Sequence, residues 1–310
     1  MQKLNEELDA ALKSNGLDFY KNQVPEYIYS NLRKDFNLRP YQLEAFGRFN
    51  FFWKGYHDRS KGVPTQLLYH MATGSGKTLI MAGLIIYLYE QGYRNFLFFV
   101  NNTDIIEKTR DNFFNTTSSK YLFADSITIS GKHIKIKEVE NFQAANQEDI
   151  NIVFSTIQGL HSRLNTPKEN SLTYDDFEET KIVLISDEAH HINAETKKKK
   201  ELKKNEVEDI LSWEGTVNRI FNANRENLLL EFTATADLFN KQIEEKYSDK
   251  LIFDYPLKQF RVDGYSKEVK LLQADLSPFD RAIQGVLLSQ YRRKIFEKYK
   301  KQVKPVILFK

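Results

Sequence analysis

The chain has 310 residues, of which 41% are hydrophobic and 28% charged, and its formal net charge is +3. That length and apolar content suffice for one large globular domain with additions. Cysteine is absent, which excludes a disulfide framework and any thiolate metal site, argues against zinc and fits a reducing compartment. The mild positive charge alone does not indicate a nucleic-acid-binding protein.

The first 34 residues read as short polar helices, with breaks at Gly16 and Pro25. This stretch lacks the apolar core of a signal peptide, and the longest apolar run, around residues 79–89, is too short to cross a bilayer. We therefore expect a soluble, cytoplasmic protein with no membrane partner, in which residues 1–34 form a helical extension.

The most informative segment reads Met71-Ala72-Thr73-Gly74-Ser75-Gly76-Lys77-Thr78, between an apolar run and a helical pattern. A strand, a glycine-rich turn and a helix in this order direct several backbone N–H groups and a helix N-terminus at one anion. Lys77 can reach the β- and γ-phosphates, and the Thr78 hydroxyl can complete the coordination of Mg²⁺. Met71 stands where the common pattern has glycine. The alternative of a flexible Gly-Ser-Gly linker fits poorly with a flanking strand and helix.

Short, β-rich apolar runs recur along the chain, most of them followed by helical patterns. The expected strands are residues 66–70, 96–100, 127–129, 152–155, 182–186 and 228–232. This alternation predicts an α/β fold with a mostly parallel central sheet and helices on both faces. Ligand chemistry is then expected at the carboxyl ends of the strands.

Two stretches interrupt this alternation. Residues 126–136 predict a β-hairpin that turns at Ser130-Gly131. Residues 195–208 are rich in lysine and read either as a solvated loop or as a phosphate-binding patch, and the sequence leaves both interpretations open.

The apolar run from residue 182 ends in Asp187-Glu188-Ala189-His190-His191, so one strand delivers two acids at its carboxyl end. Hydrolysis of a nucleoside triphosphate needs a carboxylate that holds Mg²⁺ and a second group that orients water. We assign Asp187 to the metal and Glu188 to the water. The alternative, acids that merely stabilise a helix N-terminus, is weakened by the phosphate loop earlier in the chain. The two histidines have no third metal ligand spaced nearby.

After Asp275 a charged helical pattern extends to about residue 301, and an apolar-rich run follows at residues 304–310. The run has the character of a strand whose sheet lies elsewhere. We expect residues 276–310 to be a linker helix and the first strand of a truncated second domain.

The phosphate loop and the string Asp187-Glu188-Ala189-His190 resemble motifs I and II of the superfamily 2 helicases and translocases, in which the first loop glycine is not required. Further segments match the same family in the same order: residues 38–42 (Q motif), 99–103 (motif Ia), 154–160 (motif Ib) and 232–236 (motif III). Each of these alone could be an ordinary strand-to-helix turn with a capping residue. The ordered set implies a RecA-like P-loop domain over residues 35–275 that binds ATP and Mg²⁺.

The resemblance also implies roles for individual residues. Gln42 is expected to pair with adenine, and His190 to hydrogen-bond toward motif III and couple hydrolysis to strand movement. The expected catalytic residues are Lys77, Asp187, Glu188 and His190, with Thr78 and Asp187 holding the metal. The expected nucleotide-binding residues are Arg39, Gln42, Thr73, Gly74, Ser75, Gly76, Lys77 and Thr78. Those expected at the nucleic-acid backbone, or coupling it to hydrolysis, are Asn101, Asn102, Thr103, Thr156, Gln158, Thr233 and Thr235.

Within the superfamily, the chain most resembles the motor subunits of restriction systems, above all the type III restriction subunit. The resemblance lies in the residues of motifs I to III and in the segments 213–217, 255–257 and Asp263-Gly264-Tyr265. That branch implies double-stranded DNA as the substrate and a modification (methyltransferase) subunit as partner. The alternatives are an RNA or repair helicase, and a nucleotide-switched binding module without productive turnover.

The sequence shows neither a nuclease pattern nor the arginine motif with which a second motor domain completes the site. We therefore expect this chain to bind ATP but to hydrolyse it slowly.

Overall fold

The structure is a computed structural model that describes residues 3–55, 63–143, 145–166, 172–188, 204–238, 240–266, 273 and 275–308, with side chains in residues 204–212 left aside. Residues 1–266 belong to one compact unit and residues 267–310 to a second. The first unit contains the sheet and all the predicted motifs that fall within the described residues.

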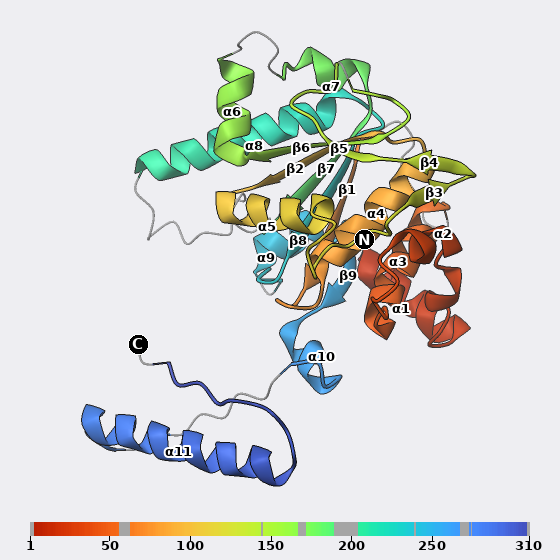
Figure 1. The fold of residues 1–310 in the computed structure, drawn as a ribbon. Coiled ribbons are helices and arrows are strands. Elements are labelled where there is room, and N and C mark those ends of the chain that lie inside the picture. The colour runs from red at the N-terminus through yellow and green to blue at the C-terminus, as the bar shows by residue number, and fades with distance from the viewer. Residues whose placement is uncertain are drawn as a thin grey trace. The chain divides into compact units, whose positions relative to one another are not determined.

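Within the described residues the central sheet has seven strands, all paired in parallel, in the order β5-β6-β2-β7-β8-β1-β9 (Figure 1). Their bounds are β1 (Thr65–Met71), β2 (Asn95–Val100), β5 (Ile136–Glu138), β6 (Ile150–Thr156), β7 (Ile182–Asp187), β8 (Leu228–Thr233) and β9 (Leu251–Tyr255). The α/β prediction is confirmed. Strands β5 and β9 were not among the predicted strands.

The predicted strand at residues 127–129 exists but lies outside the main sheet. It is β3 (Ile127–Ile129), which pairs in antiparallel fashion with β4 (Lys132–Ile134). The turn between them has positive φ at Ser130 (49°) and Gly131 (79°), the left-handed pair that suits a two-residue hairpin. The predicted hairpin is therefore confirmed.

Helices cover both faces of the sheet, as Figure 1 shows. On one face lie α3 (Pro40–Trp53), α4 (Lys77–Glu90) and α5 (Thr103–Phe114); on the other lie α6 (Ile157–Asn165), α7 (Asp175–Glu179) and α8 (Lys204–Ala223). Two shorter helices, α9 (Lys241–Tyr247) and α10 (Leu257–Val262), flank β9 in the sequence.

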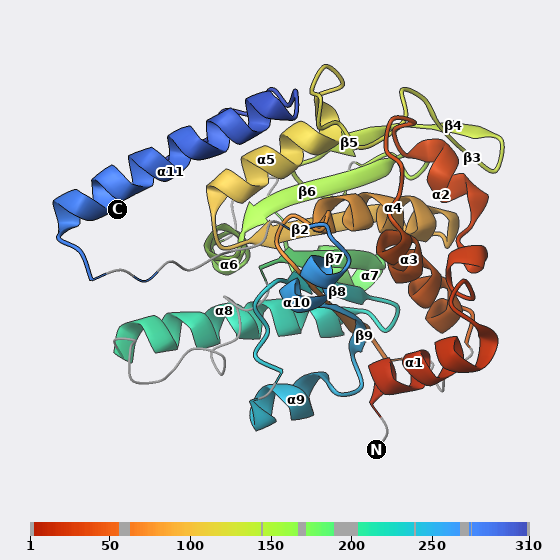
Figure 2. The same ribbon diagram turned by 90° about the horizontal axis from the view of Figure 1, so that it is seen from below.

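The N-terminal residues form the predicted short helices, α1 (Leu4–Asn15), a 3₁₀ turn at Lys21–Gln23 and α2 (Glu26–Asn31). Gly16 ends α1 at φ 94°, and Pro25 caps α2 at its start. Figure 2 shows α1 beside β9, the edge strand, and α2 beside the β3–β4 hairpin. Leu4 and Leu8 are buried in the main core, so this extension is part of the compact unit.

Alternation along the strands builds a separate apolar core on each face of the sheet. In β2, Phe96 and Phe98 are buried in the core under α3, α4 and α5, whereas Leu97 and Phe99 are buried in the core under α6, α7 and α8. Successive side chains of a strand point to opposite faces, and a strand covered on both faces is apolar throughout. This two-sided burial explains why the strand signals are continuous apolar runs.

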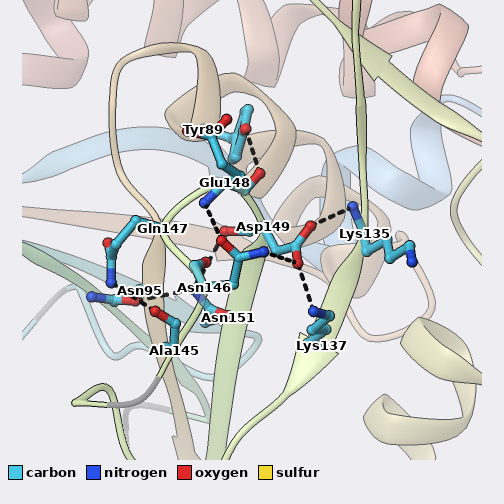
Figure 3. Close-up of polar contacts among 10 residues, drawn as sticks. All are labelled: Tyr89, Asn95, Lys135, Lys137, Ala145, Asn146, Gln147, Glu148, Asp149 and Asn151. Atoms are coloured by element: carbon cyan, nitrogen blue, oxygen red, sulfur yellow. Dashed lines mark hydrogen bonds and ion pairs between the residues drawn. The ribbon is translucent and has the colours of Figure 1, made fainter.

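The amino-terminal edge of the sheet is closed by a polar network around the turn that leads into β6 (Figure 3). Asp149 accepts hydrogen bonds from the Lys135 backbone N–H at 3.2 Å and the Asn146 side chain at 3.0 Å, and it forms an ion pair with Lys137 at 2.7 Å. The Tyr89 hydroxyl donates to the Glu148 carbonyl at 2.7 Å. These contacts pin α4, β5 and β6 at the end of the sheet opposite the predicted site.

The second unit contains α11 (Pro278–Lys298), which Ser277 caps by accepting a hydrogen bond from the Asp280 backbone N–H. Residues 303–308 form no strand, as expected of a segment without a neighbouring strand to pair with. The proposed second domain stays a prediction. Among the described residues, no helix is both long and apolar enough to span a membrane.

Candidate nucleotide and nucleic-acid site

The carboxyl ends of β1, β8 and β7 meet at one edge of the sheet. The parallel register aligns Tyr69 of β1 with Phe232 of β8, and Phe232 with Asp187 of β7, so these three residues form one row across the sheet. The glycine-rich turn begins after Met71, the last residue of β1 and the second beyond that row. The phosphate loop and the two acids therefore share an edge, as the motif interpretation requires.

The turn after β1 has the backbone of an anion cradle. Gly74 (φ 79°) and Gly76 (φ 90°) adopt left-handed conformations, and Gly76 caps the start of α4. A Cβ built on Gly74 would meet open space, whereas one on Gly76 would lie 2.6 Å from the Gln42 amide nitrogen. Glycine is thus required at both positions by the backbone and at Gly76 also by packing. The backbone N–H groups in the first turn of a helix have no hydrogen-bond partner within that helix. Those of α4 lie at the end of this turn and are available to an anion.

Lys77 is the first residue of α4, and its ammonium reaches back to the Met71 carbonyl at 3.4 Å. Burial lowers the pKa of Lys77, while the charges of Asp187 and Glu188 raise it and offset part of that shift. The effect of both acids on the pKa of this lysine is consistent with the shared end of the strands.

Asp187 ends β7 on the α4 side of the sheet. Burial raises the pKa of its carboxyl to about 6, against the opposing effects of the Lys77 charge and of the Glu188 backbone N–H, which donates to Asp187 Oδ1 at 3.0 Å. Glu188 itself has φ 58°, a left-handed backbone that costs a non-glycine residue of the order of 1 kcal/mol. Such strain and a raised carboxyl pKa are both typical of functional sites.

These residues fit a magnesium–nucleotide complex. Among the described residues no three His, Asp or Glu side chains cluster as a metal site of their own. Mg²⁺ is commonly bound by one or two protein ligands together with water and phosphate oxygens, and Thr78 and Asp187 are suited to that role. The hydroxyl of Ser75 is buried in the turn without a hydrogen-bond partner, an atom that a bound phosphate group could satisfy. A bound Mg²⁺ would neutralise phosphate charge as the bond to the terminal phosphate breaks.

Gln42 is placed next to the cradle, but its amide is engaged by the protein. Its Oε1 accepts the Arg39 backbone N–H at 2.9 Å, and its Nε2 donates to the Ser75 carbonyl at 3.0 Å. The Tyr41 hydroxyl donates to the same Ser75 carbonyl at 2.7 Å. Gln42 is only 5% exposed. The start of α3 is therefore hydrogen-bonded to the glycine-rich turn at residues 73–78, which we call the phosphate turn. The pairing of Gln42 with adenine stays a prediction.

The remaining predicted residues lie at the same edge of the sheet, and two of them act as helix caps. Asn102 Oδ1 accepts the Asp104 N–H at 2.9 Å at the start of α5, and Thr156 Oγ1 accepts the Gly159 N–H at 3.0 Å at the start of α6. This is the capping role that the sequence alone allowed. Exposed side chains that remain available to a ligand are those of Asn102, Thr103, Gln158 and Thr235.

Asn101 and Thr233 lie deeper. The Asn101 Oδ1 atom is buried without a hydrogen-bond partner. Thr233, 2% exposed, aligns with His70 of β1, and its hydroxyl accepts the Thr235 N–H at 3.2 Å. His190 and the lysine-rich residues 195–203 lie outside the described residues, so their predicted roles stay predictions.

Sequence reasoning missed two contacts beside the cradle. His70 Nδ1 lies 2.7 Å from Asp254 Oδ1 and joins β1 to β9. Tyr41 stacks on Tyr255 with ring centroids 4.2 Å apart and an interplanar angle of 14°. The sequence signal for the second contact was present in the aromatic residues around positions 255 and 265.

The parallel sheet, the glycine-rich turn and the acids at its carboxyl edge define a RecA-like P-loop domain. The family model for "Type III restriction enzyme, res subunit" matches residues 35–238. The chain belongs to this family. It is also 39% identical, over 94% of its length, to the "Probable type III restriction-modification enzyme HindVIP Res subunit" of Haemophilus influenzae, and it spans 60% of the length of that relative.

Similar solved structures include the Sulfolobus solfataricus SWI2/SNF2 ATPase core in complex with double-stranded DNA, at 17% identity and a TM-score of 0.40, covering 78% of this chain and 41% of that one. Another is the ATP-dependent Type ISP restriction-modification enzyme LlaBIII bound to DNA, at 17% identity and a TM-score of 0.44, covering 74% of this chain and 16% of that one. The family assignment rests on the sequence matches.

Proposed function

We propose that this chain is the ATP-binding and ATP-hydrolysing motor domain of the restriction subunit of a type III restriction–modification system. The observation that carries the proposal is the shared sheet edge of the Lys77 turn and Asp187, in a chain of the Res family. In this proposal Lys77 binds the β- and γ-phosphates, Thr78 and Asp187 hold Mg²⁺, and Glu188 orients the attacking water, with His190 coupling the site to motif III.

The proposed partners follow from restriction chemistry. Double-stranded DNA is the proposed substrate, contacted along its backbone by residues that follow β2, β6 and β8, and a methyltransferase subunit is the proposed partner that recognises sequence. Because both proposed partners would be met inside the cell, we also propose a cytoplasmic location. The proposed domains are a helical extension (1–34), the first motor domain (35–275) and the start of a second motor domain (276–310).

The test uses the complete subunit and measures ATP turnover with and without duplex DNA. Lys77→Ala and Glu188→Gln are each expected to lower DNA-stimulated turnover by about 10²-fold or more, because phosphate binding and water activation are lost. Lys132→Ala and Glu148→Gln are matched controls, because this exposed ion pair lies at the opposite edge of the sheet. Both controls should keep wild-type turnover.

Retention of DNA-stimulated turnover in both site variants would contradict the proposal. Stimulation by duplex RNA in place of duplex DNA would favour an RNA helicase. Tight nucleotide binding without turnover in the complete subunit would favour a nucleotide-switched binding module.

A further inference from the structure

The segment Asp263-Gly264-Tyr265, noted in the sequence, ends α10 in a Schellman turn that fixes the position of Tyr265. The Tyr265 N–H donates to the Phe260 carbonyl at 3.1 Å, and the Gly264 N–H donates to the Arg261 carbonyl at 3.0 Å, with Gly264 at φ 79°. The rings of Phe260 and Tyr265 pack with centroids 5.8 Å apart, the apolar contact that accompanies this turn. Tyr265 is thus held by backbone and side-chain contacts.

The end of α10 is in turn tied to β9. Asp263 accepts hydrogen bonds from the Tyr255 hydroxyl at 2.5 Å and from the Gln259 amide at 2.8 Å. Tyr255 stacks on Tyr41, whose hydroxyl bonds the Ser75 carbonyl of the phosphate turn. A continuous set of contacts therefore sets the distance between the Tyr265 ring and the phosphate turn.

The Tyr265 ring carries a cation beside it. The Arg39 guanidinium lies over the ring at 4.6 Å from its centroid and donates to the Tyr41 hydroxyl at 3.1 Å. Tyr41 meets the Tyr265 ring edge-on at 5.3 Å, so only one residue separates this ring from the phosphate turn. Tyr265 is 37% exposed, which leaves part of the ring open to a ligand.

We propose that Tyr265 is a base-stacking residue of the nucleotide site and that the base of a bound nucleoside triphosphate stacks on the Arg39–Tyr265 pair. The inference rests on the proposed function, because it takes the phosphates to lie in the turn at residues 73–78. Aromatic rings and guanidinium planes both stack on nucleobases, and stacking tolerates any base because each has a π-face. The pair therefore contributes to affinity for ATP and GTP alike and contributes nothing to binding of the phosphate chain.

The experiment measures dissociation constants by calorimetry for Mg²⁺ complexes of ATP, GTP and inorganic triphosphate. Tyr265→Leu is expected to weaken ATP and GTP binding by about 5- to 100-fold, the range that loss of one stacking contact produces. It should leave the affinity for inorganic triphosphate unchanged. Tyr265→Phe keeps the ring and should retain wild-type affinity for all three ligands. Tyr299→Leu removes an exposed tyrosine of the second unit and is the matched control.

A second variant changes the position of the Tyr265 ring by altering the backbone turn before it. Gly264→Ala places a side chain where nothing lies within 4 Å, so its only effect is on the left-handed turn that positions Tyr265. It should weaken ATP and GTP binding in the same direction as Tyr265→Leu, again without affecting inorganic triphosphate. If Tyr265→Leu fails to fold, this variant decides the question.

Several outcomes would overturn the inference. Unchanged ATP affinity in the deciding variant means that the base does not touch the ring, and tighter ATP binding means that the ring blocks the base. Equal losses for ATP and inorganic triphosphate mean that Tyr265 only supports the phosphate turn. A failure of the proposed function would be detected separately. In that case the wild-type protein and the Lys77→Ala variant would have the same dissociation constant for ATP.

Discussion

Two aspartates at opposite ends of the strands of the same sheet have pKa values that are shifted in opposite directions. At the amino edge, burial would raise the pKa of Asp149, but hydrogen bonds from Lys137, the Lys135 N–H and Asn146 outweigh burial and lower it. At the carboxyl edge, burial dominates at Asp187 and raises its pKa to about 6. Within the chain, Asp149 accepts several hydrogen bonds, whereas Asp187 accepts one from the Glu188 N–H.

The contrast extends to the surroundings of each residue. At the same end of the sheet as Asp187 are the strained backbone of Glu188 and the buried, unpartnered hydroxyl of Ser75 in the glycine-rich turn. Buried polar groups are normally hydrogen-bonded, so a cluster of exceptions marks the place where a ligand belongs. Asp149 is satisfied by partners within the chain, whereas Asp187 has the unmet hydrogen-bonding capacity that its predicted role as a Mg²⁺ ligand requires.

The largest expected difference between the two aspartates is in turnover. Asp187→Asn should lower DNA-stimulated ATP turnover of the complete subunit by about 10²-fold or more, because a neutral amide binds Mg²⁺ poorly. Asp149→Asn should keep wild-type turnover per folded molecule. A steady-state phosphate-release assay measures both. Equal losses in the two variants would remove the distinction drawn between the two edges.

The next difference is in stability. Asp149→Asn should destabilise the fold by about 2 kcal/mol, because Lys137 loses its partner and two amide donors then face each other at Asn146. Asp187→Asn should stabilise the fold at neutral pH by about 1–2 kcal/mol, because a poorly compensated buried charge is removed. Thermal denaturation of this chain measures both, and shifts of the same sign would contradict the interpretation.

The stability gain of Asp187→Asn should depend on pH. The folded pKa of about 6 exceeds the unfolded value near 4, so between these values the native state binds more protons than the unfolded state. The free energy of unfolding contributed by Asp187 therefore falls as the pH rises from about 4 to 6. The melting temperature of Asp187→Asn should match that of the wild type near pH 4.5 and exceed it at pH 7.5. A gap that is constant with pH would refute the assignment to Asp187.

The smallest expected effect concerns the strained residue. Glu188→Gly should raise the free energy of unfolding by up to about 1 kcal/mol, because glycine adopts φ 58° without cost. The same change should abolish turnover, because it removes the carboxylate proposed to orient water. Glu188→Gln, which keeps the strain, is the matched variant and should leave the melting temperature close to that of the wild type. Destabilisation by the glycine would show that the left-handed backbone is not strained.

The sequence predicted the strands that are long, buried on both faces and apolar throughout, and it predicted the phosphate turn and the acids. It missed β5 because Ile136–Glu138 is a three-residue edge strand with exposed polar side chains. It predicted the hairpin that β3 and β4 form, but counted residues 127–129 among the strands of the α/β alternation, although they lie outside the main sheet, because partner choice depends on long-range contacts. The contacts of Gln42 with Arg39 and Ser75 could not be predicted from the local pattern, and its pairing with adenine stays a prediction.

The position of β8 between β1 and β7 has a consequence for ligand choice. Neighbouring strands are about 4.8 Å apart, so the lysine-bearing turn and Asp187 stand on strands about 10 Å apart. Side chains that project from these two strands narrow that interval, and a phosphate chain with its cation would fit between them. The order of the strands thus sets how far apart the two halves of the candidate site are anchored in the backbone.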